Sequence, residues 1–510
     1  MEFLLFLMIP ALLLWGGIFA ARASVYLVAA LFMVATAVFP AEFFSVQAAG
    51  LTWTLDRLLF LALIASFAVG WYRGQVELSS WHLADLAVAA FLGWLAVRTF
   101  TQPLGSIAPH QPHTLMHAIN GYCIPLALYA VLRFSKPSAI ALRPAFWVIA
   151  ILGFYLSVTA WFEAAKLWGL VFPKFIADPS LGIHFGRARG PMLQSVRLGV
   201  CLLACWSCIV VTCVWLSPFS KSRWLFVAAS IPVYWGAVFF TYTRSIWMGL
   251  VLIVAMFVVF CLQGAARRAL VVGGGLASLL LAVVIGPHLV AFKREYSAEE
   301  TRESTYMRAA FAYVSLQMFK ERPIAGFGFN QFNAANRQFL SDRSTNIRLE
   351  SIRGYVHHNS FLSLLVDLGI VGLALYLMML TAFVRQSWEL YRRVSAPPWV
   401  RRLGLLSLCI TGVHLIQMAF HEVSFSSIEN SLLLGCFGLV VSARNCLEAA
   451  QESRHYQPAL DGSCNPLVAL VPLNPGTLAF RISSELRLAP LFQVIASLKN
   501  RLIQVGIRRR

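Results

Sequence analysis

The sequence predicts an all-α polytopic membrane protein with about 12–13 transmembrane helices and one large loop that carries a short amphipathic helix. Of its 510 residues, 59% are hydrophobic and only 12% are charged, whereas soluble domains carry about 25% charged residues. Apolar runs recur along nearly the whole chain, and most approach the ~20 residues that span a bilayer as a helix. These runs are too long for barrel strands, so helices are expected to satisfy the backbone within the membrane.

Thirteen apolar runs define the expected helices. The first run has the composition of a signal peptide, but no positive charge precedes it, so it is kept as a span. It lies close to the second run, which leaves twelve spans as the alternative. The runs are 3–20, 25–39, 57–72, 84–100, 116–133, 144–165, 195–216, 225–242, 246–263, 269–289, 360–383, 403–420 and 427–443.

The positive charges indicate the orientation of the chain. Lysine and arginine number 41 against 22 aspartates and glutamates, a net charge of +19. They gather in alternate loops, near residues 133–143, 221–223, 267–268 and 385–402, which the positive-inside rule places in the cytoplasm. The C-terminus is then cytoplasmic, and the side of the N-terminus depends on the number of spans. The loops expected outside are 101–115, 171–194, 243–245, 290–358 and 421–426.

Four parts are expected along the chain. Residues 1–289 form a transmembrane bundle with short loops, 290–358 the large outer loop, 359–445 the closing transmembrane helices, and 446–510 a basic cytoplasmic tail. The cysteines lie mostly inside spans, which indicates packing and no disulfide framework. The chain has no Asp-x-Asp pair, no P-loop and no GxGxxG motif. It therefore resembles neither an ATP-driven transporter nor a metal-dependent sugar transferase, and no cofactor or metal is expected.

The outer loop contains a predicted amphipathic helix between Ser304 and Arg322, and Pro323 is expected to end it. We expect its apolar face to rest on the bundle or on the outer leaflet. Two glycines, Gly326 and Gly328, follow in a tight turn. The apolar stripe consists of Met307, Phe311, Val314 and Met318.

Four arginines at the outer ends of the expected spans are candidates for binding phosphate. They are Arg187, Arg189, Arg244 and Arg308. A guanidinium is permanently charged and binds phosphate oxygens in a bidentate manner, although an arginine at a membrane boundary often serves only as an anchor. Arg244 lies in a very short connection between two spans, and an ionisable group held at membrane depth is a functional candidate. Together these arginines suit a diphosphate attached to a lipid.

The sequence His357-His358-Asn359 leads directly into the run that begins at residue 360. Histidine titrates near neutral pH and is a common general base, but a hydrogen-bonded histidine at the membrane interface is an equal alternative. Asn359 suits either a helix cap or a substrate contact. Asp367, about two turns further on, suits either a partner for a cation or the lining of a hydrated cavity.

Four segments, taken in order, resemble the O-antigen ligase and O-antigen polymerase superfamily of bacterial membrane glycosyltransferases. They differ from the family pattern in two ways: Ser245 follows the arginine of the Ser-Arg turn, and Asp367 stands where the family has glutamate. The segments are Arg187-Ala188-Arg189-Gly190-Pro191, Thr243-Arg244-Ser245, Met307-Arg308 with Pro323 to Gly328, and His358-Asn359-Ser360-Phe361-Leu362 with Asp367 to Gly372.

The resemblance implies transfer or polymerisation of an undecaprenyl-diphosphate-linked glycan at the periplasmic face of the inner membrane, in lipopolysaccharide or exopolysaccharide biosynthesis. The acceptor is a lipid A core sugar, another carrier-linked glycan or, in some relatives, a protein. The four arginines would hold the diphosphate and His358 would activate the acceptor, with His357, Asn359 and Asp367 supporting it, in an inverting reaction without metal.

The alternative to this enzyme is a transporter or flippase of the same lipid-linked glycan. The sequence shows neither inverted repeats nor broken helices, which such transporters often have.

Overall fold

The computed structural model describes residues 16–18, 22–48, 51–76, 81–103, 113–216, 221–262, 264–284, 298–355 and 357–455. The chain divides into two units, residues 1–450 and 451–510. The second unit lies almost entirely outside the described residues, as does most of the predicted tail. The first apolar run, of which residues 16–18 are described, also lies largely outside them.

The all-α prediction is confirmed, since each expected run from the second onward coincides with helix. Among the described residues, nine helices are long and apolar enough to cross a membrane, and α2 and α9 contain shorter apolar segments. One span combines α5, η1 and α6. The helices are α2 Val25–Val38, α3 Leu55–Tyr72, α4 Leu83–Phe100, α5 Thr114–Ala118, η1 Ile119–Cys123, α6 Ile124–Phe134, α7 Ala139–Ala164, α8 Ser195–Leu216, α9 Lys221–Phe240, α10 Arg244–Cys261, α11 Gly264–Val284, α13 Ala298–Glu321, α14 Phe332–Ala335, α15 Ser360–Arg392, α16 Pro398–Phe420 and α17 Ser427–His455.

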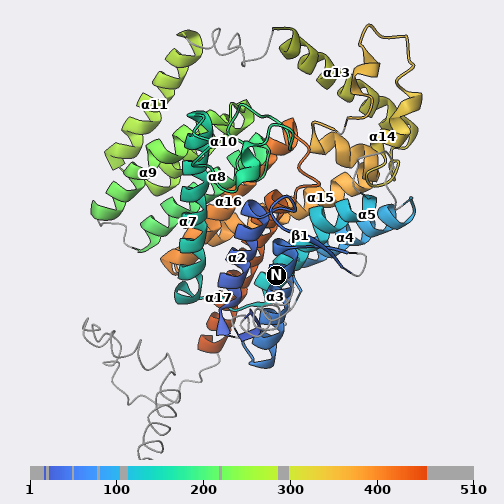
Figure 1. Ribbon diagram of the computed structural model, residues 1–510. Coiled ribbons are helices and arrows are strands. Elements are labelled where there is room, and N and C mark those ends of the chain that lie inside the picture. Colours follow the sequence, from blue (N-terminus) through green and yellow to red (C-terminus); the bar gives the residue numbers. More distant parts are fainter. Residues whose placement is uncertain are drawn as a thin grey trace, which may run out of the picture. The chain divides into compact units, whose positions relative to one another are not determined.

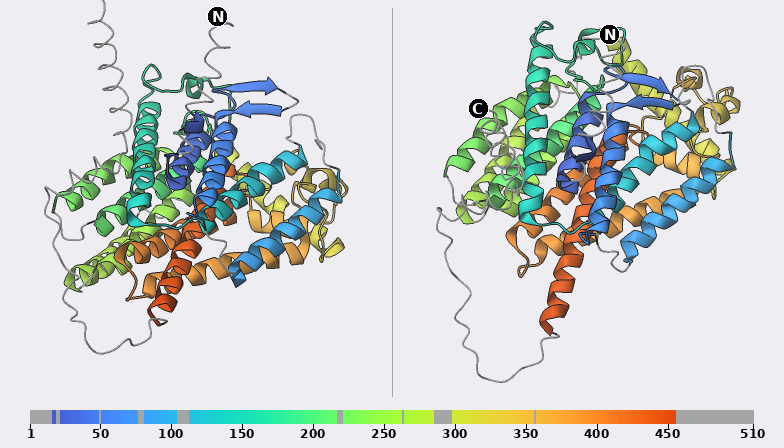
Figure 2. Two further views of the ribbon diagram at one scale, coloured as in Figure 1. Left: turned by 90° about the horizontal axis from the view of Figure 1, so that it is seen from below. Right: turned by 60° about the horizontal axis from the view of Figure 1, so that its bottom comes forward.

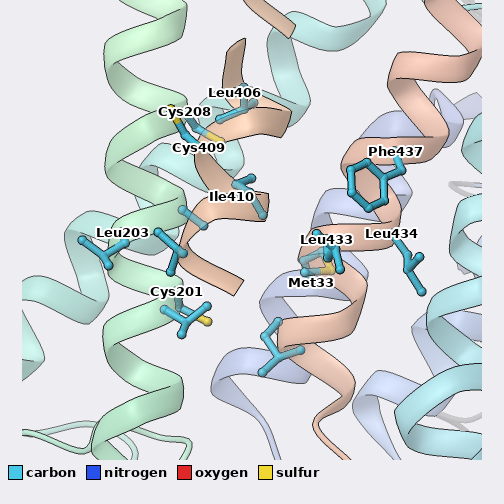
Figure 3. Packing of buried hydrophobic residues seen from close by; sticks show 14 of the residues in the cluster. Met33, Cys201, Leu203, Cys208, Leu406, Cys409, Ile410, Leu433, Leu434 and Phe437 are labelled. Carbon is cyan, nitrogen blue, oxygen red and sulfur yellow. The ribbon is translucent and has the colours of Figure 1, made fainter. Parts of the chain in front are cut away.

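Helix α8 lies in the interior of the bundle and packs on α7, α9, α10 and α16, while α15 packs on α16 and α4 (Figure 1). Side chains of α2, α8, α16 and α17 form a continuous apolar core (Figure 3). Cys208 of α8 and Cys409 of α16 are buried free thiols in this core. The cysteines described there pack as small apolar side chains, as the sequence predicts.

Contacts between loops sort the helix ends into two groups. At one end Val76 bridges Ser135, and the ring of His82 is 2.7 Å from the Asn445 side-chain oxygen. These contacts join the α3–α4 and α6–α7 connections with α17, and we call this end the basic end. At the other end, the outer end, the Ala188 N–H donates to the Phe240 carbonyl oxygen at 3.0 Å. The two groups of helix ends agree with the alternation of basic and outer loops predicted from charge. Which compartment each end faces stays a prediction.

Two short strands that the sequence analysis did not predict connect α2 to α3. Strands β1 Ser45–Ala48 and β2 Leu51–Thr54 pair antiparallel, with Val46 opposite Trp53. They extend beyond the outer ends of α2 and α3 (Figure 2). Strands of four residues carry too little alternation to be told from a loop by sequence pattern.

A buried ion pair joins α4 to α6 near the basic end. The Arg133 guanidinium donates to both oxygens of Asp85 at 2.9 Å, and the Tyr129 hydroxyl donates to the same carboxylate at 2.6 Å. The charge pattern predicts that Arg133 lies in a basic loop and helps to determine the orientation of the chain. The structure instead buries its side chain between helices, with every charge compensated.

Asp85→Ala is expected to lower the free energy of unfolding by about 3–5 kcal/mol, because it leaves a buried guanidinium without its partner. Glu389→Ala is the matched control, since Glu389 pairs with Arg385 and Arg444 at an exposed position and such pairs contribute about 0–1 kcal/mol. Thermal unfolding of both purified variants in detergent provides the measurement. Equal losses of stability would contradict a structural role for the buried pair.

Candidate functional site

Helix α13 (Ala298–Glu321) confirms the predicted amphipathic helix, which ends just before Pro323. Its apolar face does not rest on the outer leaflet. Phe311, Val314 and Met318 are buried against Val366 of α15 and against side chains of the loop itself, so the loop has a small core of its own. Helices α13 and α14 therefore sit on the first turns of α15 (Figure 1). The loop residues that complete this core are Phe327, Phe332, Leu340, Leu349 and Ile352.

Helix α15 is broken at Gly369, where the backbone has φ 69° and ψ −174°. This finding corrects the expectation that the chain has no broken helix. The segment after α13 fills the break: Ile370 N–H donates to the Pro323 carbonyl oxygen at 2.9 Å, and Phe327 N–H donates to that of Val366 at 2.9 Å. The Trp94 indole covers the break by donating to the Leu368 carbonyl oxygen at 2.9 Å.

Asp367 anchors the same docked segment. Its carboxylate accepts the Asn330 N–H at 2.8 Å, and its carbonyl oxygen accepts the Gly328 N–H at 2.8 Å. The side chain is buried beneath the outer loop. Asp367 therefore holds backbone of the outer loop, and its charge also acts on Arg98 of α4.

Gly369→Ala is expected to undock the outer loop and to reduce both stability and activity strongly. A Cβ at this position would lie 2.1 Å from the Ile324 carbonyl oxygen, in a backbone conformation with positive φ. Gly264→Ala is the matched control, because Gly264 has φ +63° but nothing within 4 Å of its Cβ position. The control should lose only the ~1–2 kcal/mol of a left-handed alanine. The measurements are thermal unfolding and turnover of both variants. Equal losses in both would contradict the role of Gly369 in docking the outer loop.

The Ser-Arg turn is fixed to the end of α16. Arg244 is the first residue of α10, and its side chain is exposed. The adjacent Ser245 hydroxyl donates to the Gln417 side-chain oxygen at 2.9 Å and lies 2.9 Å from Nε2 of His421. The Gln417 amide returns a hydrogen bond to the Ser245 carbonyl oxygen at 3.1 Å. His421 therefore helps to orient the turn that carries Arg244.

The beginning of α15 is fixed to the same end of α16. Asn359 caps α15 by accepting the Leu362 N–H at 3.0 Å, and its amide donates to the Ala419 carbonyl oxygen at 2.9 Å. The Ser360 hydroxyl donates to the carbonyl oxygen of His421 at 2.9 Å. Asn359 therefore acts as a helix cap, one of the two roles considered. Both the Arg244 turn and the His358 turn are attached to one scaffold.

The two adjacent histidines occupy different environments. His357 is only 3% exposed, and its ring centre lies 3.8 Å from that of Phe332. Burial, with a smaller effect of the neighbouring His358, lowers the pKa of His357 to about 3. His358 is exposed and meets the ring edge of Phe311 at 5.2 Å. Its partial withdrawal from water, together with the positive charge of Arg308, lowers the pKa of His358.

Arg308 lies within electrostatic range of both Arg244 and His358. Partial withdrawal from water and the charge of Arg244 lower the pKa of Arg308. Among the ion pairs of the described residues, none includes Arg244 or Arg308. We call Arg244, Arg308 and His358 the outer cation cluster. Two guanidiniums that repel each other without a carboxylate between them are arranged for an anionic ligand.

Arg189 is used differently from the prediction. Its side chain is 0% exposed, and the guanidinium donates to the carbonyl oxygens of Ile176, Asp178 and Leu181. It also lies 4.8 Å from the ring centre of Phe185. These contacts occupy the donors that a diphosphate would need. Arg189 therefore folds the outer loop between α7 and α8 from within.

Glu163 completes this loop. Its carboxylate accepts the N–H groups of Arg189 and Gly190 at 3.1 Å and 2.8 Å. Arg187 lies half-buried in the same loop, and its N–H donates to the His184 carbonyl oxygen at 3.1 Å. In the Arg187-Ala188-Arg189-Gly190 segment, Arg189 is fully buried and Arg187 is half-buried.

The fold and the outer cation cluster define a multi-pass α-helical membrane protein with a cationic site at one end of its bundle. The family model described as O-Antigen ligase matches residues 227–377, from α9 into α15. This segment is therefore similar to the O-antigen ligase family, which confirms the resemblance to the O-antigen ligase and polymerase superfamily. Arg244, Arg308 and His358 lie within the matched segment, and Arg187 and Arg189 lie outside it. A comparison with curated proteins gives no match.

Proposed function

We propose that this protein is a glycosyltransferase that transfers or polymerises a glycan carried on undecaprenyl diphosphate. The observation that carries the proposal is the outer cation cluster, in which Arg308 interacts with both Arg244 and the solvent-accessible His358. The match of residues 227–377 to the O-antigen ligase family supports a lipid-linked glycan as the donor. The acceptor is proposed to be a lipid A core sugar or a second carrier-linked glycan.

In the proposed reaction, Arg244 and Arg308 bind the diphosphate that links the glycan to its lipid. The acceptor hydroxyl attacks the anomeric carbon from the side opposite the diphosphate and gives its proton to His358. The bond between the anomeric carbon and the phosphate oxygen breaks, and its electron pair leaves with the diphosphate. The two guanidiniums stabilise this added negative charge. Because the acceptor attacks from the side opposite the diphosphate, the configuration at the anomeric carbon inverts.

His358 suits the base for two reasons. Its ring is exposed, so that an acceptor hydroxyl can reach it, whereas His357 lies between Phe332 and Phe311. Its lowered pKa keeps it neutral at physiological pH, as a base must be before reaction. His357 is proposed to position His358 from beneath. Arg187 remains a proposed contact of the diphosphate, and Arg189 is assigned to loop structure.

The broken helix does not favour the transporter alternative. In transporters a broken helix exposes its backbone groups to a cavity or a substrate path. Here the Ile370 N–H donates to the carbonyl oxygen of Pro323 and the Phe327 N–H donates to that of Val366, so that the outer loop occupies the break at Gly369. The cationic side chains of the proposed site, the outer cation cluster, also gather at one end of the bundle.

The proposed location is the bacterial inner membrane, with the outer cation cluster at the periplasmic face. The positive-inside rule supports this orientation, because Arg385, Arg392 and Arg401 lie at the opposite end from the cluster. The proposed pathway is the synthesis of lipopolysaccharide or exopolysaccharide at the cell surface.

The proposed function is tested with purified protein in liposomes, a labelled carrier-linked glycan, and either a lipid A core or a second carrier-linked glycan as acceptor. We expect label to appear in covalent linkage to one acceptor with wild-type protein and not with His358→Ala. Movement of the donor across the bilayer without formation of a new glycosidic bond would contradict the proposal and support a flippase.

Activity is expected to persist in excess EDTA. Arginines stand at the proposed diphosphate site, and the described residues contain no group of three or more His, Cys, Asp or Glu side chains that gather as metal ligands. The measurement is the initial rate with and without chelator. Loss of activity in EDTA, with recovery on addition of Mg²⁺ or Mn²⁺, would contradict the metal-independent mechanism.

A further inference from the structure

A second cationic feature lies at the basic end, opposite the outer cation cluster. A cavity of about 500 Å³ opens between the beginning of α2, the end of α3 and the connection from α6 to α7. Three cationic side chains line it, and none of the described residues in its lining is acidic. Such a volume is within the range of small-ligand sites. The three cations are Arg22, Arg73 and Lys136.

Two further features of the lining favour a negative ligand. Ser24 and Val25, at the start of α2, line the cavity, so that the positive end of the helix dipole faces it. Tyr26 also lines it, is 5% exposed, and its buried hydroxyl has no hydrogen-bond partner among the described residues. Buried hydroxyl groups are normally hydrogen-bonded. A phosphate oxygen is an acceptor that this donor lacks.

The neighbouring side chains place the cavity at the level of lipid headgroups. Trp71 and Tyr72 end α3 immediately before Arg73, and they are 57% and 94% exposed. Exposed tryptophan and tyrosine at the end of a membrane span mark the interface between hydrocarbon and water. Basic pockets between transmembrane helices at the cytoplasmic side bind the headgroups of anionic lipids.

We propose that this cavity binds the phosphate group of an anionic ligand, with an anionic phospholipid of the adjacent leaflet as its source. The phosphate lies between Arg73 and Lys136 and receives the Tyr26 hydroxyl, while the acyl chains follow the apolar surface of α3. Such a lipid would link α2, α3 and the α6–α7 connection. This site is distinct from the proposed donor site, and the inference does not depend on the proposed function.

The test is a binding titration of the purified full-length chain in neutral detergent, read by native mass spectrometry. The probes are phosphatidylglycerol, zwitterionic phosphatidylcholine and inorganic phosphate. The test variant is Arg73→Gln with Lys136→Gln, both exposed positions. The matched control is Arg267→Gln with Arg268→Gln, which removes two exposed cations of α11 that do not line the cavity.

We expect wild type to bind phosphatidylglycerol in preference to phosphatidylcholine. The Arg73/Lys136 double variant should bind it roughly 30-fold more weakly, because each cation near an anionic headgroup contributes about a fivefold factor. The control should bind as wild type does, and Tyr26→Phe should be weakened by a smaller factor. If inorganic phosphate binds with the same dependence on the variants, the phosphate site stands and its source is soluble. Equal affinity in the test and control variants would overturn the proposal.

Discussion

His358→Ala is expected to lower turnover by roughly 10²–10⁴-fold, the usual contribution of a general base. Affinity for the lipid-linked donor should be nearly unchanged, because Arg244 and Arg308 remain in place. The exposed position of His358 predicts that the protein still folds. Turnover and donor affinity measured on the same preparation separate loss of the base from loss of binding.

His357→Ala is the companion variant. Its effect on turnover should be milder, and its main effect should be on stability, because the ring fills space against Phe332 and Phe311. If His357→Ala loses turnover at normal stability while His358→Ala keeps it, the assignment of the base is reversed. If both variants keep turnover, arginine positioning alone has to account for the reaction.

The pH profile gives a readout that loss of structure does not mimic. Because the pKa of His358 is lowered, the acidic limb of turnover should lie below the ordinary histidine range near 6.5. Arg308→Gln removes one of the two causes of this shift and should move the acidic limb to higher pH. An unchanged limb in Arg308→Gln would contradict the electrostatic coupling between the two residues.

Arg244→Lys is expected to weaken donor binding and turnover by roughly 10–100-fold even though the positive charge remains. A lysine ammonium is a point charge that cannot form the bidentate contact of a guanidinium, and each hydrogen bond to a charged group contributes about 1.5–3 kcal/mol. The protein should fold normally, since the turn is held by Ser245 and Gln417.

Arg353→Lys is the matched control, because Arg353 is an exposed arginine of the outer loop that pairs with Glu350. We expect it to bind donor and turn over as wild type does. Near-normal turnover in Arg244→Lys would mean that Arg244 is an anchor at the membrane surface and no more.

The bundle was predictable because its signal is long and repeated. Each apolar run from 25–39 onward became helix, and α13 ended at the predicted proline. The break in α15 was not predictable, since the φ of Gly369 depends on the Pro323 segment that docks there. From sequence alone, a glycine inside an apolar run is expected to be an ordinary helix residue, because the long-range contact that breaks the helix is not visible there.

The candidate site was predictable in part. Arg244, Arg308 and His358 were selected for their places at span ends, and the structure brings Arg308 within electrostatic range of the other two. Arg189 was selected by the same reasoning, yet its guanidinium is buried among carbonyl oxygens of its own loop. The sequence does not distinguish these outcomes, because both arginines lie in polar segments between spans. Gln417, near the end of α16, and His421, which follows that helix, bind Ser245 in the structure. No sequence pattern indicated this contact.

We propose that Arg244, Arg308 and His358 form one site for the diphosphate of a lipid-linked glycan. The most direct measurement is photocrosslinking with an undecaprenyl diphosphate that carries a photoreactive group beside the phosphates, followed by peptide mapping. We expect labelled peptides that contain Arg244 and Arg308, and we expect excess unmodified donor to reduce the labelling. Absence of competed label from both peptides, with labelling elsewhere in the protein, would contradict the proposal.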